Sequence, residues 1–339
     1  MEIPMSHALP ILDFSQFRAG GEAQANFIAE LADVTHNIGF FYLKNHGIDQ
    51  TLIDDTFSLS KAFFALPLED KLAIEMIHSR HFRGYTRFYN EITRERPDGR
   101  EQLDYMPEYE ALPLESIPDH QPWLRLQGPN QWPPQLPQLK PTLLALQAAQ
   151  VALAKELLSA FAQALGQPAD AFAHTYAHKP SVLCKAIHYP GTEDTKQGVG
   201  IHKDAGYLTF VSQDEASGLE VLKGDQWVSA TPIRGTFVVN IGELLEIASQ
   251  GYLKATQHRV TTPPVGTDRY SLAFFLTSQL DATVPLLDLP AHLQPANFAI
   301  TQDPKNPLFT EIGKNFLKGR LRSHPDVARA HYADLLAQF

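Results

Sequence analysis

Three polar residues, His202, Lys203 and Asp204, interrupt the strand-like run GVGIHKDAGYLTF, residues 198 to 210. Side chains two positions apart share one face of a strand, so His202 and Asp204 point the same way and Lys203 points oppositely. An imidazole and a carboxylate are ligands of the type that divalent transition metals bind. His258, in a later strand-like run, supplies a third. Two histidines and one carboxylate form the facial triad that leaves positions open for oxygen chemistry at non-heme Fe(II), so the residue types predict a metal site.

A second pair lies in the next strand-like run, where Arg269 and Ser271 are again two positions apart. An arginine beside a hydroxyl can clamp a carboxylate through charge-assisted, bidentate hydrogen bonds. An unpaired arginine inside a β-core is costly, so we expect Arg269 to have an anionic partner. That partner is either a bound carboxylate or, in a structural interpretation, a core Asp or Glu. The same structural interpretation makes the HKD run, His258 and Arg269 one salt-bridge network.

Short β-like runs separated by turn residues fill the chain from about residue 180 to 280, and they must position these side chains. Their spacing predicts an antiparallel barrel or jelly roll rather than a parallel βαβ sheet. Before them, the proline-rich stretch GPNQWPPQLPQLKP, residues 128 to 141, predicts irregular structure and the best boundary in the chain. The segment from 83 to 105 shows no clean period, and we expect a long, functional loop there.

Helical spacing marks the amino-terminal third, the middle and the tail of the chain. Apolar residues recur at helical intervals over residues 27–38, closed by Gly39, and again over residues 52–64. A longer helix is expected over residues 143–161, closed by Gly166, and a last one over 325–339. The run FFYLKNHG predicts a strand after the first helix.

Composition narrows the function classes. The chain has 339 residues, of which 44% are hydrophobic and 19% charged, as in a globular protein. Its formal net charge of −10 and the absence of a basic run argue against a nucleic-acid partner. No leader-like start or apolar run long enough to span a membrane is evident, and the single cysteine, Cys184, fits a reducing compartment. We therefore expect a cytoplasmic protein with no membrane partner.

Segments along most of the chain resemble the isopenicillin N synthase-like superfamily of Fe(II)- and 2-oxoglutarate-dependent oxygenases. The resemblance runs from about residue 9 to about 322, and the matching segments are GFFYLKNHGI, FFALPLEDK, RGY, GPNQWP, HKDAGYLTFVSQDEASGLEVL and GELLEIASQGYLKATQHRV. EITRERPDGREQLDY is similar to the microbial branch. The resemblance implies a mixed α+β fold: a double-stranded β-helix (jelly-roll) core flanked by helices, with a helical amino-terminal region.

The resemblance also implies roles for six residues. His202, Asp204 and His258 fall on the Fe(II) ligands. Arg269 and Ser271 fall on the pair that holds the distal carboxylate of 2-oxoglutarate, and Tyr189 falls on a tyrosine whose hydroxyl also reaches that cosubstrate. The family's N-Y-Y-P pattern reads Ile187, His188, Tyr189 and Pro190 here, so the asparagine often near the cosubstrate is missing. Other departures are Lys185 for Arg, Lys203 for Thr and Glu243 for Asp. None of these removes a ligand, and the roles of Lys185, His188 and Lys203 stay open.

The implied reaction is oxidation of a small-molecule substrate, usually hydroxylation, with O2 and release of succinate and CO2. Desaturation, cyclisation or ethylene formation stay open as outcomes. One alternative is an isopenicillin N synthase-type oxidase that uses no 2-oxoglutarate, for which Gln338 would be a further ligand. Another is a metal- or ligand-binding relative without catalysis. Substrate contacts are expected from loops of the amino-terminal part and strand faces near the iron, with the candidates Arg83, Tyr85, Arg87, Phe88 and Phe275.

Four regions follow from these expectations. Residues 1–127 form the amino-terminal dioxygenase region with its substrate loops, and residues 128–178 form the proline-rich linker and long helix. Residues 179–285 form the double-stranded β-helix core with the Fe(II) and 2-oxoglutarate site, and residues 286–339 form a carboxy-terminal extension and helix. We expect a monomer or a weak homo-oligomer.

Overall fold

Strands from both halves of the chain build one large sheet in this computed structural model, which describes residues 9–192, 197–294, 300 and 306–338. The strands lie in the order β1 (Ile11–Asp13), β2 (Phe40–Lys44), β12 (Thr236–Ile241), β9 (Leu208–Gln213), β14 (Arg269–Ser278), β7 (Ser181–Tyr189), β6 (Glu101–Tyr105) and β3 (Gly84–Thr86). Neighbouring strands are antiparallel, apart from the parallel pair β1 and β2.

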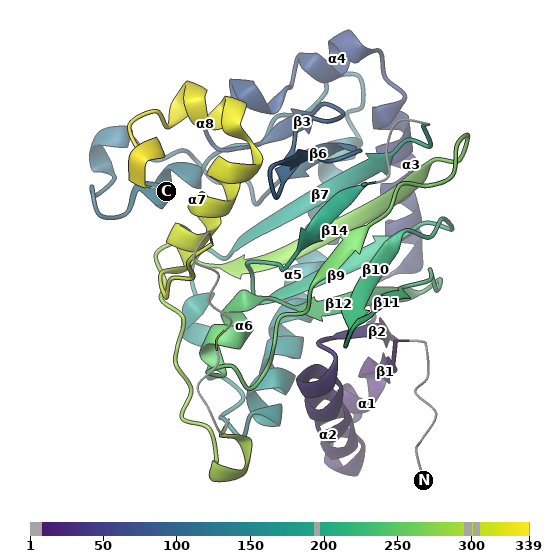
Figure 1. Ribbon diagram of the computed structural model, residues 1–339, viewed down its shortest axis with the longest axis vertical. Helices are drawn as coiled ribbons and strands as arrows, with labels where there is room; N and C mark the ends of the chain where they lie inside the picture. The colour runs from purple at the N-terminus through teal and green to yellow at the C-terminus, as the bar shows by residue number, and fades with distance from the viewer. Residues whose placement is uncertain (1–8, 193–196, 295–299, 301–305, 339) are drawn as a thin grey trace.

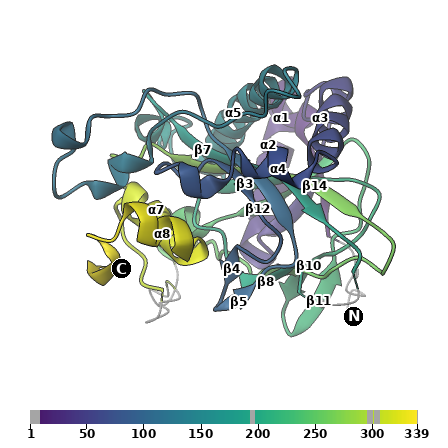
Figure 2. The same ribbon diagram turned by 90° about the horizontal axis from the view of Figure 1, so that it is seen from above.

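A smaller antiparallel sheet lies against one face of the large sheet (Figures 1 and 2). Its strands lie in the order β11 (Gln226–Ser229), β10 (Leu219–Lys223), β13 (His258–Val260) and β8 (Val199–His202). A short hairpin of β4 (Ile92–Thr93) and β5 (Arg96–Pro97) lies beside β8. The two sheets form the jelly-roll core that the strand-like runs predicted, with the candidate metal residues on the smaller one.

The helices are α1 (Phe14–Ala19), α2 (Gly21–Asn37), α3 (Gln50–Phe64), α4 (Leu68–Leu72), α5 (Leu139–Ala164), α6 (Glu243–Ala248), α7 (Ile312–Ser323) and α8 (Pro325–His331). Figure 2 shows α1, α2, α3 and α5 together on the outer side of the large sheet. The three longest confirm the expected helices of the first half. Gly39 and Gly166 follow α2 and α5 with φ of 70° and 69°, the left-handed conformation that ends helices.

Helix α5 is long and apolar enough, by length and composition, to cross a membrane, which the sequence reading of short apolar runs missed. Its apolar residues have another explanation. Leucines such as Leu146, Leu153 and Leu157 are buried in the main core. The helix packs on α2, α3 and β14, so its hydropathy is that of a core helix.

Two expectations about element boundaries were wrong. The segment from 83 to 105 is not one long loop, because it holds β3, β4, β5 and β6, and β6 pairs with β7 inside the large sheet. Charged residues on both faces of β6 removed the apolar alternation that identifies a strand: Glu101 pairs with Lys71 on one side and Asp104 with Lys185 on the other. The tail is also not one helix, since α8 ends at His331, and α7 before it was not predicted.

The division into four regions at residues 127, 178 and 285 stays a prediction. The strands β1, β2, β3 and β6, from the first region, lie in the same sheet as β7, β9, β12 and β14 from the third.

Candidate metal centre

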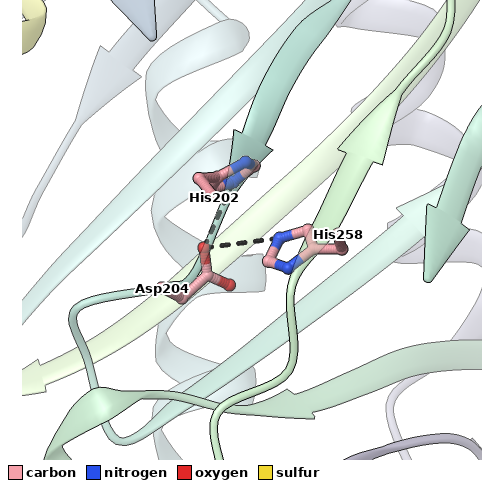
Figure 3. A group of neighbouring side chains, drawn as sticks. All are labelled: His202, Asp204 and His258. Carbon is pink, nitrogen blue, oxygen red and sulfur yellow. Dashed lines mark ion pairs between the residues drawn. The ribbon is translucent and has the colours of Figure 1, made fainter. Parts of the chain in front are cut away.

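His202, Asp204 and His258 come together where β8 and β13 meet (Figure 3). The two strands pair with His258 opposite His202, so their imidazole rings lie side by side with centroids 4.2 Å apart. Asp204 Oδ1 lies 3.5 Å from Nε2 of each histidine. One nitrogen or oxygen from each side chain lies within 4.8 Å of the others. One divalent cation can therefore contact all three side chains.

Backbone carbonyls orient both imidazole rings. Nδ1 of His202 lies 2.8 Å from the Gly200 oxygen, and Nδ1 of His258 lies 3.2 Å from the Thr256 oxygen. Because a carbonyl oxygen only accepts, Nδ1 carries a hydrogen in each ring, and a neutral imidazole therefore has its lone pair on Nε2. Both lone pairs are thus available to a metal, which is the arrangement that second contacts of ligand histidines usually enforce.

The Asp204 carboxylate is also held from behind. Its Oδ2 accepts hydrogen bonds from Thr209 Oγ1 at 2.5 Å and Asn240 Nδ2 at 2.8 Å, while Oδ1 faces the histidines. Burial alone would raise the pKa of Asp204, but the neighbouring His258 and His202 outweigh it and hold the pKa well below its usual range. The site therefore offers an ionised oxygen together with two nitrogens, the donor set that suits Fe(II).

Arg269 is buried inside the jelly roll without a carboxylate partner. It lies opposite Tyr189 on the neighbouring strand, and its guanidinium carbon is 4.9 Å from the centre of that ring. Nε donates to the Ala216 oxygen at 3.2 Å and Nη2 to Gln213 Oε1 at 3.0 Å, but Nη1 has no partner. No Asp or Glu of the described segments pairs with Arg269, so the structural salt-bridge interpretation of this residue was wrong.

Ser271 follows two positions along β14 and is also buried, on the same face as Arg269. Tyr189, Arg269 and Ser271 thus lie together on the inner face of the large sheet. A hydroxyl beside an incompletely paired guanidinium suits a carboxylate, and 2-oxoglutarate carries one at its distal end. The residues present fit both the Fe(II) and the cosubstrate.

Comparison with known proteins decides the family. The description "non-haem dioxygenase in morphine synthesis N-terminal" matches residues 9–135, and "2OG-Fe(II) oxygenase superfamily" matches residues 178–278. The 2-oxoglutarate-dependent dioxygenase frbJ of Dothideomycetidae sp. is 35% identical, over 97% of this chain and 94% of its own length. The chain belongs to the 2OG-Fe(II) oxygenase superfamily. It is therefore an Fe(II)- and 2-oxoglutarate-dependent dioxygenase, as the resemblance implied.

Two further relatives extend the comparison. The homoarginine-6-hydroxylase 2-ODD-233 of rice is 35% identical over 82% of this oxygenase and 88% of its own length. The crystal structure of Neurospora crassa T7H in complex with alpha-KG superposes with a TM-score of 0.74 and 26% identity, covering 94% of this chain and 98% of that chain. Gln338, which would be the further ligand in the oxidase alternative, lies exposed in the carboxy-terminal turn and does not line the metal cleft.

A cleft of about 1240 Å³ opens beside His202 and Asp204 in this oxygenase. Of the five substrate-contact candidates, Phe275 lines the cleft and the other four do not. The side chains of three of these four have other partners: Arg83 donates to backbone oxygens, Tyr85 donates to Glu101, and Arg87 pairs with Glu75. The cleft thus supports Phe275 as a substrate contact, and for Arg83, Tyr85, Arg87 and Phe88 this role stays a prediction.

A buried ion network on the cleft wall was missed by the sequence reading. Lys185 Nζ lies 3.0 Å from both Glu91 Oε1 and Asp104 Oδ2. Arg100 Nη2 lies 2.6 Å from Glu91 Oε2, and Arg320 Nη1 lies 2.9 Å from Asp104 Oδ2. Lys185 therefore joins two carboxylates across β6 and β7. Arg100, just before β6, and Gln102 and Asp104 on β6 are spaced two positions apart, and this alternation of polar residues is the signal that could have revealed the network.

Replacing Glu91 with Gln is expected to destabilise the fold by about 3–5 kcal/mol, because Arg100 and Lys185 would lose a buried counter-charge. Burial would raise the pKa of Glu91, but Arg100 and Lys185 outweigh it and hold the pKa well below its ordinary value. A carboxylate with a lowered folded pKa stabilises the fold above its unfolded pKa and loses that contribution as the pH falls. The difference in the free energy of unfolding between the wild type and Glu91→Gln should therefore become smaller as the pH falls below about 4.3.

Denaturant unfolding at pH 7 and at lower pH checks this prediction. Glu220→Gln is the matched control, since Glu220 pairs with Arg259 at 2.7 Å in a partly exposed position and should cost less than about 1 kcal/mol. Equal losses in the two variants would contradict a stabilising network at Glu91.

Glu243 brings an unpaired carboxylate to the same cleft. Its backbone N–H donates a hydrogen bond to the backbone carbonyl oxygen of Asp204 at 2.8 Å, which fixes the start of α6 beside the metal residues. Gly242 makes this approach possible, because a Cβ there would lie 2.1 Å from the Gly206 oxygen. Burial raises the pKa of Glu243 to about 7, although Lys318 and Lys203 oppose it. Within the described ranges no cation lies in ion-pair distance of this carboxyl, since Lys203 pairs with Glu246 at 2.9 Å.

The β4–β5 hairpin forms part of the rim of the cleft. Its tip residues Arg94 and Glu95 have φ of 49° and 65°. Left-handed conformations at both central positions are those of a tight hairpin turn, which usually takes Asn and Gly. Side chains with a Cβ are therefore held there at a conformational cost, and strain of this kind clusters at functional sites. Both tip residues line the cleft, so the segment expected to be functional does face the metal side.

Proposed function

We propose that His202, Asp204 and His258 hold the Fe(II) of this dioxygenase, and that Arg269, Ser271 and Tyr189 hold the distal carboxylate of 2-oxoglutarate. The observation that carries the proposal is the buried Arg269 guanidinium, whose Nη1 has no partner. A bound carboxylate would satisfy that donor and supply the missing counter-charge. The Nε2 atoms of the two histidines, each 3.5 Å from Asp204 Oδ1, support the metal assignment together with that carboxylate oxygen.

When bound, Fe(II) and 2-oxoglutarate supply the oxidising chemistry: O2 is consumed, succinate and CO2 are released, and the substrate is oxidised. The chain's own residues orient the reactants. Thr209 and Asn240 keep the Asp204 carboxylate turned toward the metal, and the carbonyls behind the histidines keep their rings in place. The clamp around Arg269 fixes one end of the cosubstrate. The jelly roll excludes bulk water from that end, since all three clamp residues are buried.

We further propose that the substrate is a small polar molecule with a cationic group, of the amino-acid type. Glu243 supports this, because it is a cleft-lining carboxylate with no ion-pair partner among the residues that the structure describes. An ammonium or guanidinium group would pair with it at a site largely removed from water. The rice relative's name, which specifies homoarginine, points to the same chemical class.

Glu243→Gln is expected to lower kcat/KM for such a substrate by about 10- to 100-fold, while the affinity for 2-oxoglutarate stays unchanged. Succinate release is measured with a panel of basic amino acids, homoarginine included, and neutral analogues of equal length. Glu69→Gln, at an exposed position on α4, is the matched control and should leave kcat/KM unchanged. Equal turnover of neutral and cationic panel members would contradict the proposed substrate class.

The remaining expectations on the protein's surroundings are kept as proposals. We propose a cytoplasmic protein, acting as a monomer or weak homo-oligomer, with no nucleic-acid or membrane partner. The net charge of −10 supports the absence of a nucleic-acid partner. The single cysteine, Cys184, is buried and unpaired, which supports a reducing compartment. Size-exclusion chromatography with light scattering tests the oligomeric state.

A further inference from the structure

Gln102 is a fully buried glutamine whose amide has no hydrogen-bond partner in the described part of the chain. Its side chain has a relative exposure of 0%, and neither Oε1 nor Nε2 makes a hydrogen bond. Leaving a buried amide unsatisfied costs a folded protein free energy, so such groups are rare unless they have a function. The metal residues and the clamp described above do not use Gln102.

The register of the large sheet brings Gln102 to the cosubstrate face. It lies directly opposite Ile187 on β7, and Ile187 lies opposite Ser271 on β14. Directly paired residues share a face of a sheet, so Gln102 projects to the same side as Ser271. The neighbouring pair along β7 and β14 is Tyr189 with Arg269. Figure 1 shows β6, β7 and β14 side by side across this part of the sheet.

Gln102, Ile187 and Ser271 form one row of paired residues across β6, β7 and β14. This row is two residues along β14 from Arg269, in the direction of the metal. Further along β14 from Ser271 on the same face come Phe275 and Thr277, which line the metal cleft. Thr209, which binds the Asp204 carboxylate, lies opposite Phe275 on β9. A molecule that extends along β14 from Arg269 to the metal must therefore pass Ser271, and Gln102 lies in the same row two strands away, beyond Ile187.

Three buried nitrogen donors on this face have no partner: Arg100 Nε, Gln102 Nε2 and Arg269 Nη1. They come from β14, β6 and the residue just before β6, on strands that border a single surface. Ile187, which separates Gln102 from Ser271, has an apolar side chain and supplies no donor. An elongated dicarboxylate has acceptor oxygens at both ends and would satisfy donors at more than one of these positions.

We propose that Gln102 positions 2-oxoglutarate, with its Nε2 donating a hydrogen bond to the cosubstrate between the Arg269 clamp and the metal. This inference rests on the proposed function of Arg269 and the metal residues. In the protein without cosubstrate the unpaired amide lowers the stability of the fold, as is common where a binding site is formed before its ligand binds.

The test is Gln102→Met, which keeps the length of the side chain and removes the amide. Three quantities are measured without oxygen: the melting temperature of the metal-free protein, the affinity for Fe(II), and the affinity of the Fe(II)-loaded protein for 2-oxoglutarate by calorimetry. Gln102→Leu is measured alongside. An effect that comes from poor packing of the new side chain should differ between the two variants, whereas an effect of the lost amide should appear in both. Gln150→Met is the matched control, because Gln150 is a buried glutamine of α5 whose Nε2 also lacks a partner.

We expect Gln102→Met to raise the dissociation constant for 2-oxoglutarate about tenfold or more, with Fe(II) affinity unchanged and the metal-free melting temperature equal or higher. The control should change the 2-oxoglutarate constant less than twofold. An unchanged constant in both Gln102 variants would overturn the proposal, and so would a weaker constant accompanied by a lowered melting temperature, since that pattern indicates a structural amide. A wild-type protein that binds Fe(II) but no 2-oxoglutarate would instead contradict the proposed function itself.

Discussion

Replacing His202 with Ala is expected to abolish turnover and to weaken Fe(II) binding by more than about 100-fold, because outer partners of metal ligands alone account for roughly 10- to 100-fold. The remaining pair, Asp204 and His258, offers only two donors, and the loss of Nε2 opens the site on the β8 side. Equilibrium dialysis with Fe(II) under anaerobic conditions measures the affinity directly.

A matched control shows whether the loss of Fe(II) affinity is specific to His202 or follows from removing a histidine elsewhere in the chain. His120 lies in an exposed loop away from the cleft, so His120→Ala should bind Fe(II) as the wild type does. Stoichiometric Fe(II) retained by His202→Ala would show that the metal binds elsewhere.

Replacing Arg269 with Leu should weaken 2-oxoglutarate binding by about 2–5 kcal/mol, or roughly 30-fold to several thousand-fold. The variant removes the guanidinium that faces the distal carboxylate and leaves the Fe(II) residues untouched. The same change should leave the metal-free protein equally or more stable, because it removes a buried charge that has no carboxylate partner among the residues that the structure describes. Calorimetric titration with 2-oxoglutarate and thermal unfolding measure the two effects.

Arg259→Leu is the control for removing an arginine from a neighbouring strand, since Arg259 pairs with Glu220 on the outer side of β13. It should not change 2-oxoglutarate affinity. A strongly destabilised Arg269→Leu with normal cosubstrate affinity would mean that Arg269 serves the fold alone.

The jelly roll and its main helices could be predicted because their apolar residues follow the periods of their elements. Phe27, Leu31 and Val34 recur at helical spacing and are buried in α2. Strand β6 could not be predicted in this way, because Glu101 and Asp104 find buried cations on opposite faces, and ion pairs of this kind depend on residues distant in sequence. The local sequence pattern therefore did not identify β6, because its buried charges are compensated by ion pairs with residues distant in the sequence.

Some residues of the candidate site could be predicted from local spacing, and others could not. Residues two positions apart in a strand must share a face, so the pairing of His202 with Asp204 and of Arg269 with Ser271 followed from spacing. Gln102 and Glu243 carry no such local signal. Gln102 faces the cosubstrate side only because β6 joins β7 in a particular register, and Glu243 faces the cleft only because α6 packs against the Asp204 loop.

The most direct test is an anaerobic titration of the metal-free protein with Fe(II) and then with 2-oxoglutarate, following the visible charge-transfer band between the metal and the keto acid. We predict a band for the wild type, no band for His202→Ala, and a band for Arg269→Leu that needs far more 2-oxoglutarate. A wild-type protein that binds Fe(II) stoichiometrically and shows no band at saturating 2-oxoglutarate would contradict the assignment of these residues to a joint Fe(II) and 2-oxoglutarate site.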